Sequence, residues 1–346
     1  MEGHPSLANR RHPALVDVHS EDREPAVGER EREGESHAAN SDDSYVWGHL
    51  VQEAERAQTS RRPATTLRTG TRLAAVSDSR VSPTISIVTA VLNRAGSIGR
   101  ALASVREQDY PDVEHVVIDG GSTDGTIEIL DRSEGIRWVS EPDDGLADAM
   151  NKGIAMATGD WIGWLNSDDY YLPGALKAVA EAVESHPDAR WVTGTCRIID
   201  AGDREMRTAI TAYKNWLLRH YSFPLYLTQN FVSCPSTFVR KDAYEAVGPL
   251  DPRYRISMDY DVFLRIARRW DPVVLDRALA VFRMEQGTLS IDGFERQFAE
   301  HAEQARRHGA GYPLSVAANQ LISRGIVLTY RLMRARRRLA RSASAT

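Results

Sequence analysis

The sequence predicts an α/β protein with an open, mainly parallel, twisted sheet and helices on both of its faces. Apolar, β-branched runs of strand length alternate with segments of helical apolar spacing between residues 85 and 185. Stretches rich in Gly, Asp and Asn follow several of the predicted strands directly. Because such a sheet binds its ligands at the carboxyl ends of its strands, these stretches are candidate binding loops.

The predicted elements follow in regular order. A buried strand begins at Ile85, and "GSIGRALASVREQ" is a helix with one apolar face. The strands "EHVVID", "IRWVS" and "DWIGWLN" alternate with the helices "DGTIEILDRS", capped by Asp124, "GLADAMNKGIAMATG", ended by Gly159, and "LPGALKAVAEAVESHP". Further on, "RWVTGTCRIID" and "CPSTFVR" are predicted strands and "DYDVFLRIARRW" a helix. "VVLDRALAVFRM" is a strand pair or one bent strand, and residues 201–229 stay unassigned.

Composition excludes several classes of protein. The chain has 346 residues, 42% of them hydrophobic, and its mean hydropathy is −0.41, with no apolar run near the roughly 18 residues of a membrane span. The first residues lack the apolar stretch of an export signal, so we expect a cytoplasmic location. A net charge of −5 argues against a nucleic-acid partner. Two cysteines, Cys196 and Cys234, argue against a disulfide framework.

Two polar loops follow the first two predicted strands. Neither G-x-G-x-x-G nor a P-loop follows the first strand, which ends "TAVLNR" and offers Thr89 and Asn93. The second strand runs into "VVIDGGSTDGT", where Asp119 can accept hydrogen bonds from a nucleobase or ribose. Gly120 and Gly121 would let a ligand approach the backbone closely. A turn with a helix cap explains the same residues.

Two further clusters carry paired acids. Asp168 and Asp169 in "WLNSDDYY" come directly after a predicted strand and could bind Mg²⁺ or Mn²⁺, although a solvated turn is the alternative. Asp259 and Asp261 in "RISMDYDVFLRIA" stand at a helix start, where capping and the helix dipole favour acids. Asp259 could instead act as a general base, with Asp261 structural.

The order and spacing of these three acid-bearing turns resemble the family 2 glycosyltransferases, whose GT-A fold is a nucleotide-sugar-binding form of the doubly wound sheet. The resemblance covers about residues 83–290 and rests on "SIVTAVLNR", "QDYPDVEHVVIDGGSTDGT", "EPDDGLADAMNKGIAMATGDWIGWLNSDDYYLPGAL" and "PSTFVRKDAYEAVGPLDPRYRISMDYDVFLRIA". It implies a nucleotide-binding half at 83–170 and an acceptor half at 171–292, within a GT-A domain at 81–292.

The resemblance also implies roles for individual residues. Asp259 matches the general base of the family. Asp168 matches the last acid of the metal-binding D-x-D motif and Asp169 lies beside it, while Asn166 stands where the motif has its first Asp. The segment "DGLADAMNKG" resembles the part that closes over the donor, although a polar helix face explains it too. The implied nucleotide-sugar contacts are Thr89, Ala90, Asn93, Asp119, Asp148, Asn151 and Lys152.

The implied reaction is an inverting transfer from a nucleotide-diphosphate sugar to a saccharide or lipid-linked hydroxyl, with Mn²⁺ or Mg²⁺, in cell-surface polysaccharide or glycolipid assembly. UDP is the most frequent nucleotide in the family, and GDP and dTDP stay open. In "FRMEQGTLS", Glu285 stands where many relatives carry His, and Arg283, Thr288 and Ser290 are weaker candidates. A non-catalytic nucleotide-sugar-binding protein is one alternative. A nucleotidyltransferase is another, but the basic Gly-rich loop of that class is absent after the first strand.

The two ends of the chain are predicted to differ from the domain between them. Residues 1–80 are rich in Glu, Arg, Ser, His and Pro without periodicity and are predicted to be mostly disordered, apart from a brief helix or docking segment at "YVWGHLVQEAERA". Residues 293–346 are predicted to be helical. In the basic tail, four leucines fall within about 20° of one line on a helix, with arginines largely opposite; they are Leu321, Leu328, Leu332 and Leu339. A basic amphipathic helix on the inner face of the plasma membrane explains both features, and a solvated helix or a partner contact is the alternative.

Overall fold

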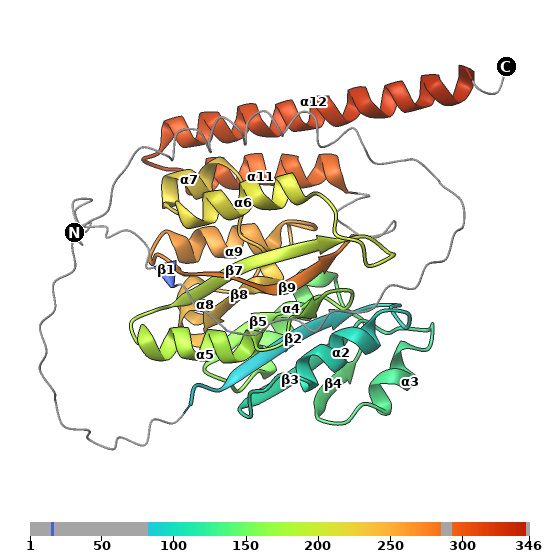
Figure 1. Cartoon of the computed structure of the whole chain (residues 1–346), viewed down its shortest axis with the longest axis vertical. Coiled ribbons are helices and arrows are strands. Elements are labelled where there is room, and N and C mark those ends of the chain that lie inside the picture. Colours follow the sequence, from blue (N-terminus) through green and yellow to red (C-terminus); the bar gives the residue numbers. More distant parts are fainter. Residues whose placement is uncertain (1–14, 17–81, 285–292, 344–346) are drawn as a thin grey trace, which may run out of the picture.

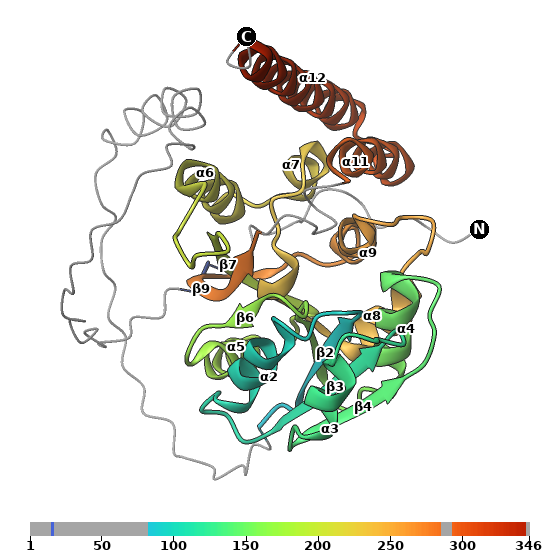
Figure 2. The same ribbon diagram turned by 90° about the vertical axis from the view of Figure 1, so that its right-hand side faces the viewer.

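The computed structural model describes residues 15–16, 82–284 and 293–343, with side chains described in 82–284 and 293–332. The strands of these residues form one mixed sheet in the order β1-β9-β7-β8-β5-β2-β3-β4, with β6 beside β9. Helices pack on both of its faces (Figures 1 and 2). The predicted fold class is therefore confirmed.

The first half of the domain is the parallel part of the sheet. The strands β5, β2, β3 and β4 lie side by side in parallel register. Their bounds are β2 (Ile85–Val91), β3 (Val113–Asp119), β4 (Ile136–Ser140) and β5 (Trp161–Trp164). The connecting helices are α2 (Ile98–Arg106), α3 (Thr126–Asp131) and α4 (Leu146–Met156). These elements were predicted, except that α4 ends before Gly159.

The second half breaks the parallel order. The strand β8 (Thr237–Arg240) runs antiparallel to both β5 and β7 (Trp191–Ile199), whereas β9 (Val273–Arg283) is parallel to β7. The stretch predicted as a strand pair or a bent strand is thus the single strand β9. Two short strands flank β9: β6 (Tyr170–Tyr171) is antiparallel and β1 (Leu15–Val16) is parallel. Those two residues depart from the disorder predicted for 1–80, whose remainder, including "YVWGHLVQEAERA", lies outside the described residues.

Five helices of the described residues lie in this half. Three of them, α6, α7 and α8, were not predicted. The bounds are α5 (Ala175–Ser185), α6 (Thr208–Arg219), α7 (Phe223–Thr228), α8 (Lys241–Val247) and α9 (Met258–Ala267). A 3₁₀ turn, η2 (Cys234–Ser236), precedes β8.

The two faces of the sheet have separate apolar cores. Leu102 of α2 and Val179 of α5 lie in one, and Met150 of α4 and Phe263 of α9 lie in the other. A Cβ on Gly153 of α4 would come within 2.3 Å of Val88 Cγ1, so only glycine lets this helix lie so close to β2. This contact sets the short distance between α4 and the sheet.

Two C-terminal helices cover the second half. The helix α11 (Phe294–His308) packs on α9 and α7, and α12 (Pro313–Ala343) packs on α11 and α7. Both views show them stacked at one end of the molecule, with β2, β3 and β4 at the other (Figures 1 and 2). Among the described residues, no helix combines the length and the apolar character that crossing a bilayer requires.

Candidate functional site

A cavity of about 970 Å³ lies between the ends of β2 and β5, the N-terminus of α9 and the C-terminal helices. This volume is at the upper end of the roughly 300–1,000 Å³ typical of ligand pockets. Its walls include Ala90 of β2, Asp168 after β5, Asp259 of α9 and His301 of α11. The carboxyl ends of the parallel strands thus open into one space with two of the three predicted acid clusters.

Asp259 lies in the first turn of α9 and faces the cavity. Burial raises the pKa of its carboxyl group to about 6, against the lowering effects of the Tyr260 backbone N–H, the charge of Lys214 and the Asn230 amide. Lys214, on α6, also lines the cavity, and burial lowers the pKa of its ammonium group. A carboxylate with a pKa of about 6 is largely ionised at neutral pH and can take a proton from a substrate hydroxyl.

Glu300 of α11, which lies after the predicted domain at 81–292, holds the segment before α9 in place. The carboxylate of Glu300 in α11 accepts hydrogen bonds from the backbone N–H groups of Arg255, Ile256 and Ser257, at 3.0, 3.1 and 3.0 Å, and from Ser257 Oγ at 3.0 Å. Burial raises the pKa of Glu300, but these hydrogen bonds outweigh it and hold the pKa below its ordinary value. The carboxylate is therefore ionised and satisfies the backbone N–H groups of the three residues that precede α9. No sequence pattern predicted this contact.

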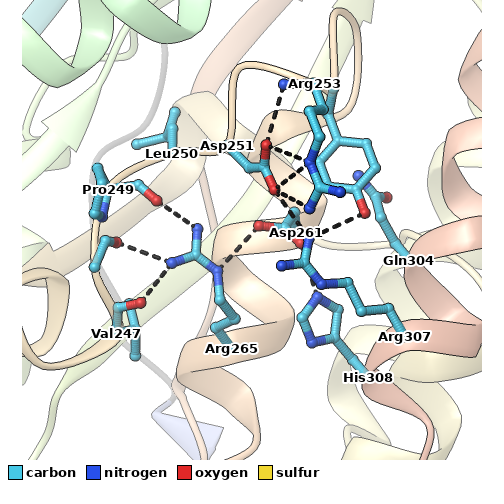
Figure 3. Close-up of polar contacts among 12 residues, drawn as sticks. Val247, Pro249, Leu250, Asp251, Arg253, Asp261, Arg265, Gln304, Arg307 and His308 are labelled. Carbon is cyan, nitrogen blue, oxygen red and sulfur yellow. Dashed lines mark hydrogen bonds and ion pairs between the residues drawn. The ribbon is translucent and has the colours of Figure 1, made fainter.

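Asp261, two residues after Asp259, points away from the cavity into a buried polar network (Figure 3). Its Oδ2 accepts a hydrogen bond from Arg265 Nε at 3.0 Å, and its Oδ1 lies 2.7 Å from His308 Nε2. Arg265 also donates to the backbone carbonyls of residues 247–249. Asp261 therefore ties α9 to α11 and to the loop before α9, which is the structural role predicted for it.

The two adjacent acids after β5 have different surroundings. Asp168 lines the cavity, whereas Asp169 is 1% exposed. Asp169 Oδ1 accepts from the Arg283 N–H at 2.9 Å, and Oδ2 accepts from Asn166 Nδ2 at 2.7 Å. Burial, and then the charge of Asp168, raise the pKa of Asp169 well above its ordinary value. Asp169 thus joins β9 to the loop and departs from its predicted role as a metal ligand.

The cavity offers a divalent cation a limited set of ligands. Across the described ranges 82–284 and 293–332, no group of three or more His, Cys, Asp or Glu side chains is placed to bind a metal ion. Mg²⁺ and similar ions, however, are commonly held by one or two carboxylates together with substrate phosphates and water. Asp168 fits such a shared ion, with Asn166 also on the cavity wall.

Asp119 ends β3 and organises the loop that follows. Its carboxylate is fully buried and accepts hydrogen bonds from the N–H groups of Gly121 and Ser122, at 3.0 and 2.9 Å, and from the hydroxyls of Ser122 and Ser140. Gly121 adopts φ of +88°, which glycine tolerates best. Three of these four bonds go to Oδ2 and one goes to Oδ1, so among the described residues Oδ1 keeps a free acceptor site. Asp119 therefore shapes the binding loop, and its contact with a nucleotide stays a prediction.

The loop after β2 is joined to this one. Asn93, at φ of +52°, accepts a hydrogen bond from the Thr123 N–H at 2.8 Å and donates its own N–H to Ser122 Oγ at 2.7 Å. Ala90 lines the cavity. The Thr89 side chain is buried within the sheet, with its hydroxyl 3.0 Å from His115 Nε2, and so presents nothing to a ligand there.

Comparisons with known proteins identify the chain. The model of glycosyl transferase family 2 matches residues 86–248. An uncharacterized glycosyltransferase of Mycobacterium tuberculosis is 32% identical over 208 residues, which cover 58% of this chain and 75% of the relative. The chain belongs to glycosyl transferase family 2. A PGL/p-HBAD biosynthesis glycosyltransferase of Mycobacterium bovis is 28% identical over 258 residues, which cover 71% of this glycosyltransferase and 95% of the relative.

Solved structures share the fold of this glycosyltransferase. A mannosyltransferase from Pyrobaculum calidifontis, in complex with GDP-Man and Mn²⁺, superposes with a TM-score of 0.56 at 17% identity over 84% of this chain and 89% of that one. Staphylococcus aureus TarS superposes with a TM-score of 0.50 at 17% identity, over 64% of this chain and 39% of that one. At these identities the similarity shows the fold, in agreement with the GT-A prediction.

The donor contacts predicted on α4 are not among the described cavity-lining residues of the glycosyltransferase. The Asn151 side chain forms two hydrogen bonds with the backbone of Leu250. It donates to the carbonyl at 3.0 Å and accepts from the N–H at 2.8 Å. Lys152 pairs with Glu141 at 2.8 Å and with Asp148 at 3.2 Å. Asp148 and Lys152 lie one turn apart on α4, so the ion pair between them runs along one face of the helix. The sequence therefore predicted that this segment lies next to the site, but it did not predict which side of α4 faces the cavity.

Several cavity residues of the glycosyltransferase were missed. They are charged side chains from four separate segments: Arg94, Asp143, Arg207, Lys214 and Arg255. Arg94 follows the first strand directly, a position that could have flagged it. Lys214 lies on α6, and because this helix was not predicted, the sequence did not indicate that Lys214 faces the site. Glu285, Thr288 and Ser290 lie outside the described residues, and Arg283 donates to the Ala201 carbonyl at 2.8 Å.

Proposed function

We propose that this glycosyltransferase moves a sugar from a nucleotide-diphosphate sugar to an acceptor hydroxyl with inversion at the anomeric carbon, and that Asp259 is the general base. The observation that carries this proposal is the carboxylate of Asp259, which lines the cavity and whose pKa burial raises to about 6. A sugar hydroxyl is a poor nucleophile until a nearby base takes its proton during attack.

The chemistry requires one carboxylate. The acceptor hydroxyl gives its proton to Asp259 while the hydroxyl oxygen forms the bond to the anomeric carbon. The bond from that carbon to the diphosphate oxygen breaks, and the diphosphate departs from the opposite face. A second carboxylate nucleophile, as in retaining hydrolases, is not needed. The cations Arg94 and Arg255 on the cavity wall suit the negative charge of a diphosphate.

We also propose that a divalent ion, Mn²⁺ or Mg²⁺, takes part. Asp168 would hold it, and the ion would stabilise the charge that develops on the leaving diphosphate. Asp169 would act only through the loop that carries Asp168, because its own oxygens accept from Arg283 and Asn166. The Mn²⁺ in the complex of the mannosyltransferase from Pyrobaculum calidifontis supports the proposal.

For the donor and the acceptor we propose only the chemical class. A UDP-sugar stays our predicted donor, and the GDP-Man of the Pyrobaculum calidifontis mannosyltransferase complex keeps GDP-sugars open. A saccharide or lipid-linked acceptor, in cell-surface polysaccharide or glycolipid assembly, is supported by the name of the PGL/p-HBAD biosynthesis relative.

The same proposal includes a cytoplasmic enzyme held on the inner face of the plasma membrane by α12. Leucines at helical spacing on this helix are 56–85% exposed: Leu314, Leu321, Leu328 and Leu332. Arg324 is exposed as well. Apolar and basic side chains exposed on one helix fit an anionic lipid surface. Failure of the chain to sediment with vesicles of anionic lipid would contradict this part of the proposal.

A thermal-shift screen tests the donor site. The chain would be melted with UDP, GDP, dTDP and CDP, each with and without Mn²⁺. At 100 times Kd a nucleotide should stabilise it by roughly 2.7 kcal/mol. The increment due to Mn²⁺ should vanish in Asp168→Asn. The matched control is Asp160→Asn, at an acid that does not line the cavity. A folded chain that no nucleotide stabilises would contradict the proposed function.

A further inference from the structure

We propose that the part of the cavity walled by α11 and α12 binds the apolar portion of the acceptor, an alkyl or aryl group attached to the sugar that receives the transfer. This inference rests on the proposed function for the identity of the ligand as an acceptor. Its evidence is the chemistry of a wall that the catalytic residues do not use.

The wall is apolar and continuous. Phe294 and Phe298 of α11 and Ile322, Ile326 and Tyr330 of α12 all line the cavity and are half-buried. The ring of Phe294 lies 4.0 Å from that of Tyr330 and 4.8 Å from that of Phe298, centroid to centroid. Side chains of this kind bind hydrocarbon, and they offer no charge to a diphosphate.

The opposite side of the same space is also largely apolar. Phe282 of β9, Met284 directly after β9 and Ile210 of α6 line the cavity there. The charged lining residues Arg94 and Asp168 follow the strands β2 and β5. Figure 1 shows β2 and the helices α11 and α12 at opposite ends of the molecule. The cavity therefore has a polar end for a charged ligand and an apolar end for a second, hydrophobic one.

His301 marks where a polar atom of the ligand would lie at the apolar end. The side chain lines the cavity, is 5% exposed, and its Nε2 has no hydrogen-bond partner within the described part of the chain. The rings of Tyr260 and Phe298 hold the imidazole at centroid distances of 5.0 and 5.4 Å. Burial lowers the pKa of His301 to about 3, so the ring is neutral. Because a buried unpaired nitrogen is costly, a ligand hydroxyl is a favourable partner for it.

The apolar end is connected to the base. Lys214 lies close enough to lower the pKa values of both Asp259 and His301, so these three groups share one region of the cavity. A hydroxyl at Asp259 and a hydrophobic tail against α12 can therefore belong to one molecule. The wall is fixed in place, since Asn319 of α12 donates to the Leu227 carbonyl of α7 at 3.0 Å.

Calorimetric titration with alkyl glycosides tests the inference. The probes are methyl and octyl β-D-glucopyranoside, β-D-galactopyranoside and α-D-mannopyranoside, used below their micelle concentrations. In at least one pair the octyl glycoside should bind at least tenfold more tightly, about 1.4 kcal/mol. Ile326→Asp should abolish the difference. The matched control Leu328→Asp, on the exposed face of the same helix, should retain it. If Ile326→Asp does not fold, Ile326→Trp should fill the space and exclude the octyl chain.

Two results would overturn the inference: equal affinity for the methyl and octyl members of every pair, or loss of the octyl preference in Leu328→Asp but not in the Ile326 variants. The thermal-shift screen separates this failure from that of the proposed function. Nucleotide binding without an octyl preference removes only the apolar site. An octyl preference that depends on Ile326, without any nucleotide binding, retains the apolar site and removes the proposed reaction.

Discussion

Replacement of Asp259 by Asn should stabilise the fold while abolishing transfer. Burial favours the protonated acid in the folded state and raises its pKa from 3.8 to about 6. A group whose acid form is favoured by folding loses stability as pH rises through this interval, because the unfolded chain releases the proton more readily. Above pH 6 the ionised carboxylate therefore destabilises the wild-type chain, whereas Asn stays neutral at every pH.

The size of the effect follows from the shift. A difference of about two pKa units corresponds to about 3 kcal/mol, at about 1.4 kcal/mol per unit. The attraction of the carboxylate for Lys214 is already included in this figure, because it is one of the effects that lower the pKa of Asp259. At pH 5 the wild-type acid is largely protonated when folded, so the gain should fall to about half its value at pH 7.5.

Urea unfolding followed by tryptophan fluorescence at pH 5 and 7.5 measures the gain, and release of nucleoside diphosphate measures transfer. We expect a more stable variant at pH 7.5, a smaller gain at pH 5, and turnover lower by at least about 100-fold. Nucleotide affinity should be unchanged. A variant that is no more stable than wild type at pH 7.5, or that keeps turnover within tenfold, would refute the reasoning for Asp259.

Three further predictions concern the same site. The wild-type kcat/KM should fall about tenfold per pH unit below a midpoint near pH 6, where Asp259 becomes protonated; a flat profile from pH 5 to 8 would argue against it. Glu300→Gln, which weakens the acceptor for three N–H groups before α9, should lower kcat about tenfold and leave nucleotide Kd unchanged, and Glu303→Gln is its exposed control on α11. An equal loss in both variants would remove Glu300 as a positioning residue. Asn151→Ala leaves the backbone of buried Leu250 without two partners and should cost about 1–3 kcal/mol of unfolding free energy with donor affinity retained; a stable variant with weakened donor binding would return Asn151 to the donor site.

Much of the fold could be predicted because its signals are local. The strand from Ile85 and the helix from Ile98 carry periods of two and 3.6 that survive without tertiary information. The helix α6 lacks such help: it starts after Arg207 at φ of +55° with no side-chain cap, and only two of its residues are buried. The helix α7 is six residues long, too short for periodicity to identify. The direction of β8 depends on its partners and could not be inferred from "TFVR".

The site shows the same division. Strand ends located Asp119, Asp168 and the loop of α4, and a helix start located Asp259, because position in a parallel sheet determines which loops meet. The orientation of individual side chains was not determined by the sequence. Adjacent residues such as Asp168 and Asp169 can face a cavity and an interior. Contributions from distant segments, such as Glu300, require the packed structure.

The most direct test of the account is the configuration of the first product. The nucleotide sugar selected by the thermal screen would be incubated with the chain, Mn²⁺ and the best-bound octyl glycoside, with water as the fallback acceptor, and the anomeric proton would be followed by NMR at early times. From an α-linked donor we expect a β-linked product, or β-sugar before mutarotation, and no product from Asp259→Asn. An α product, or equal rates in both proteins, would contradict transfer by a single carboxylate base.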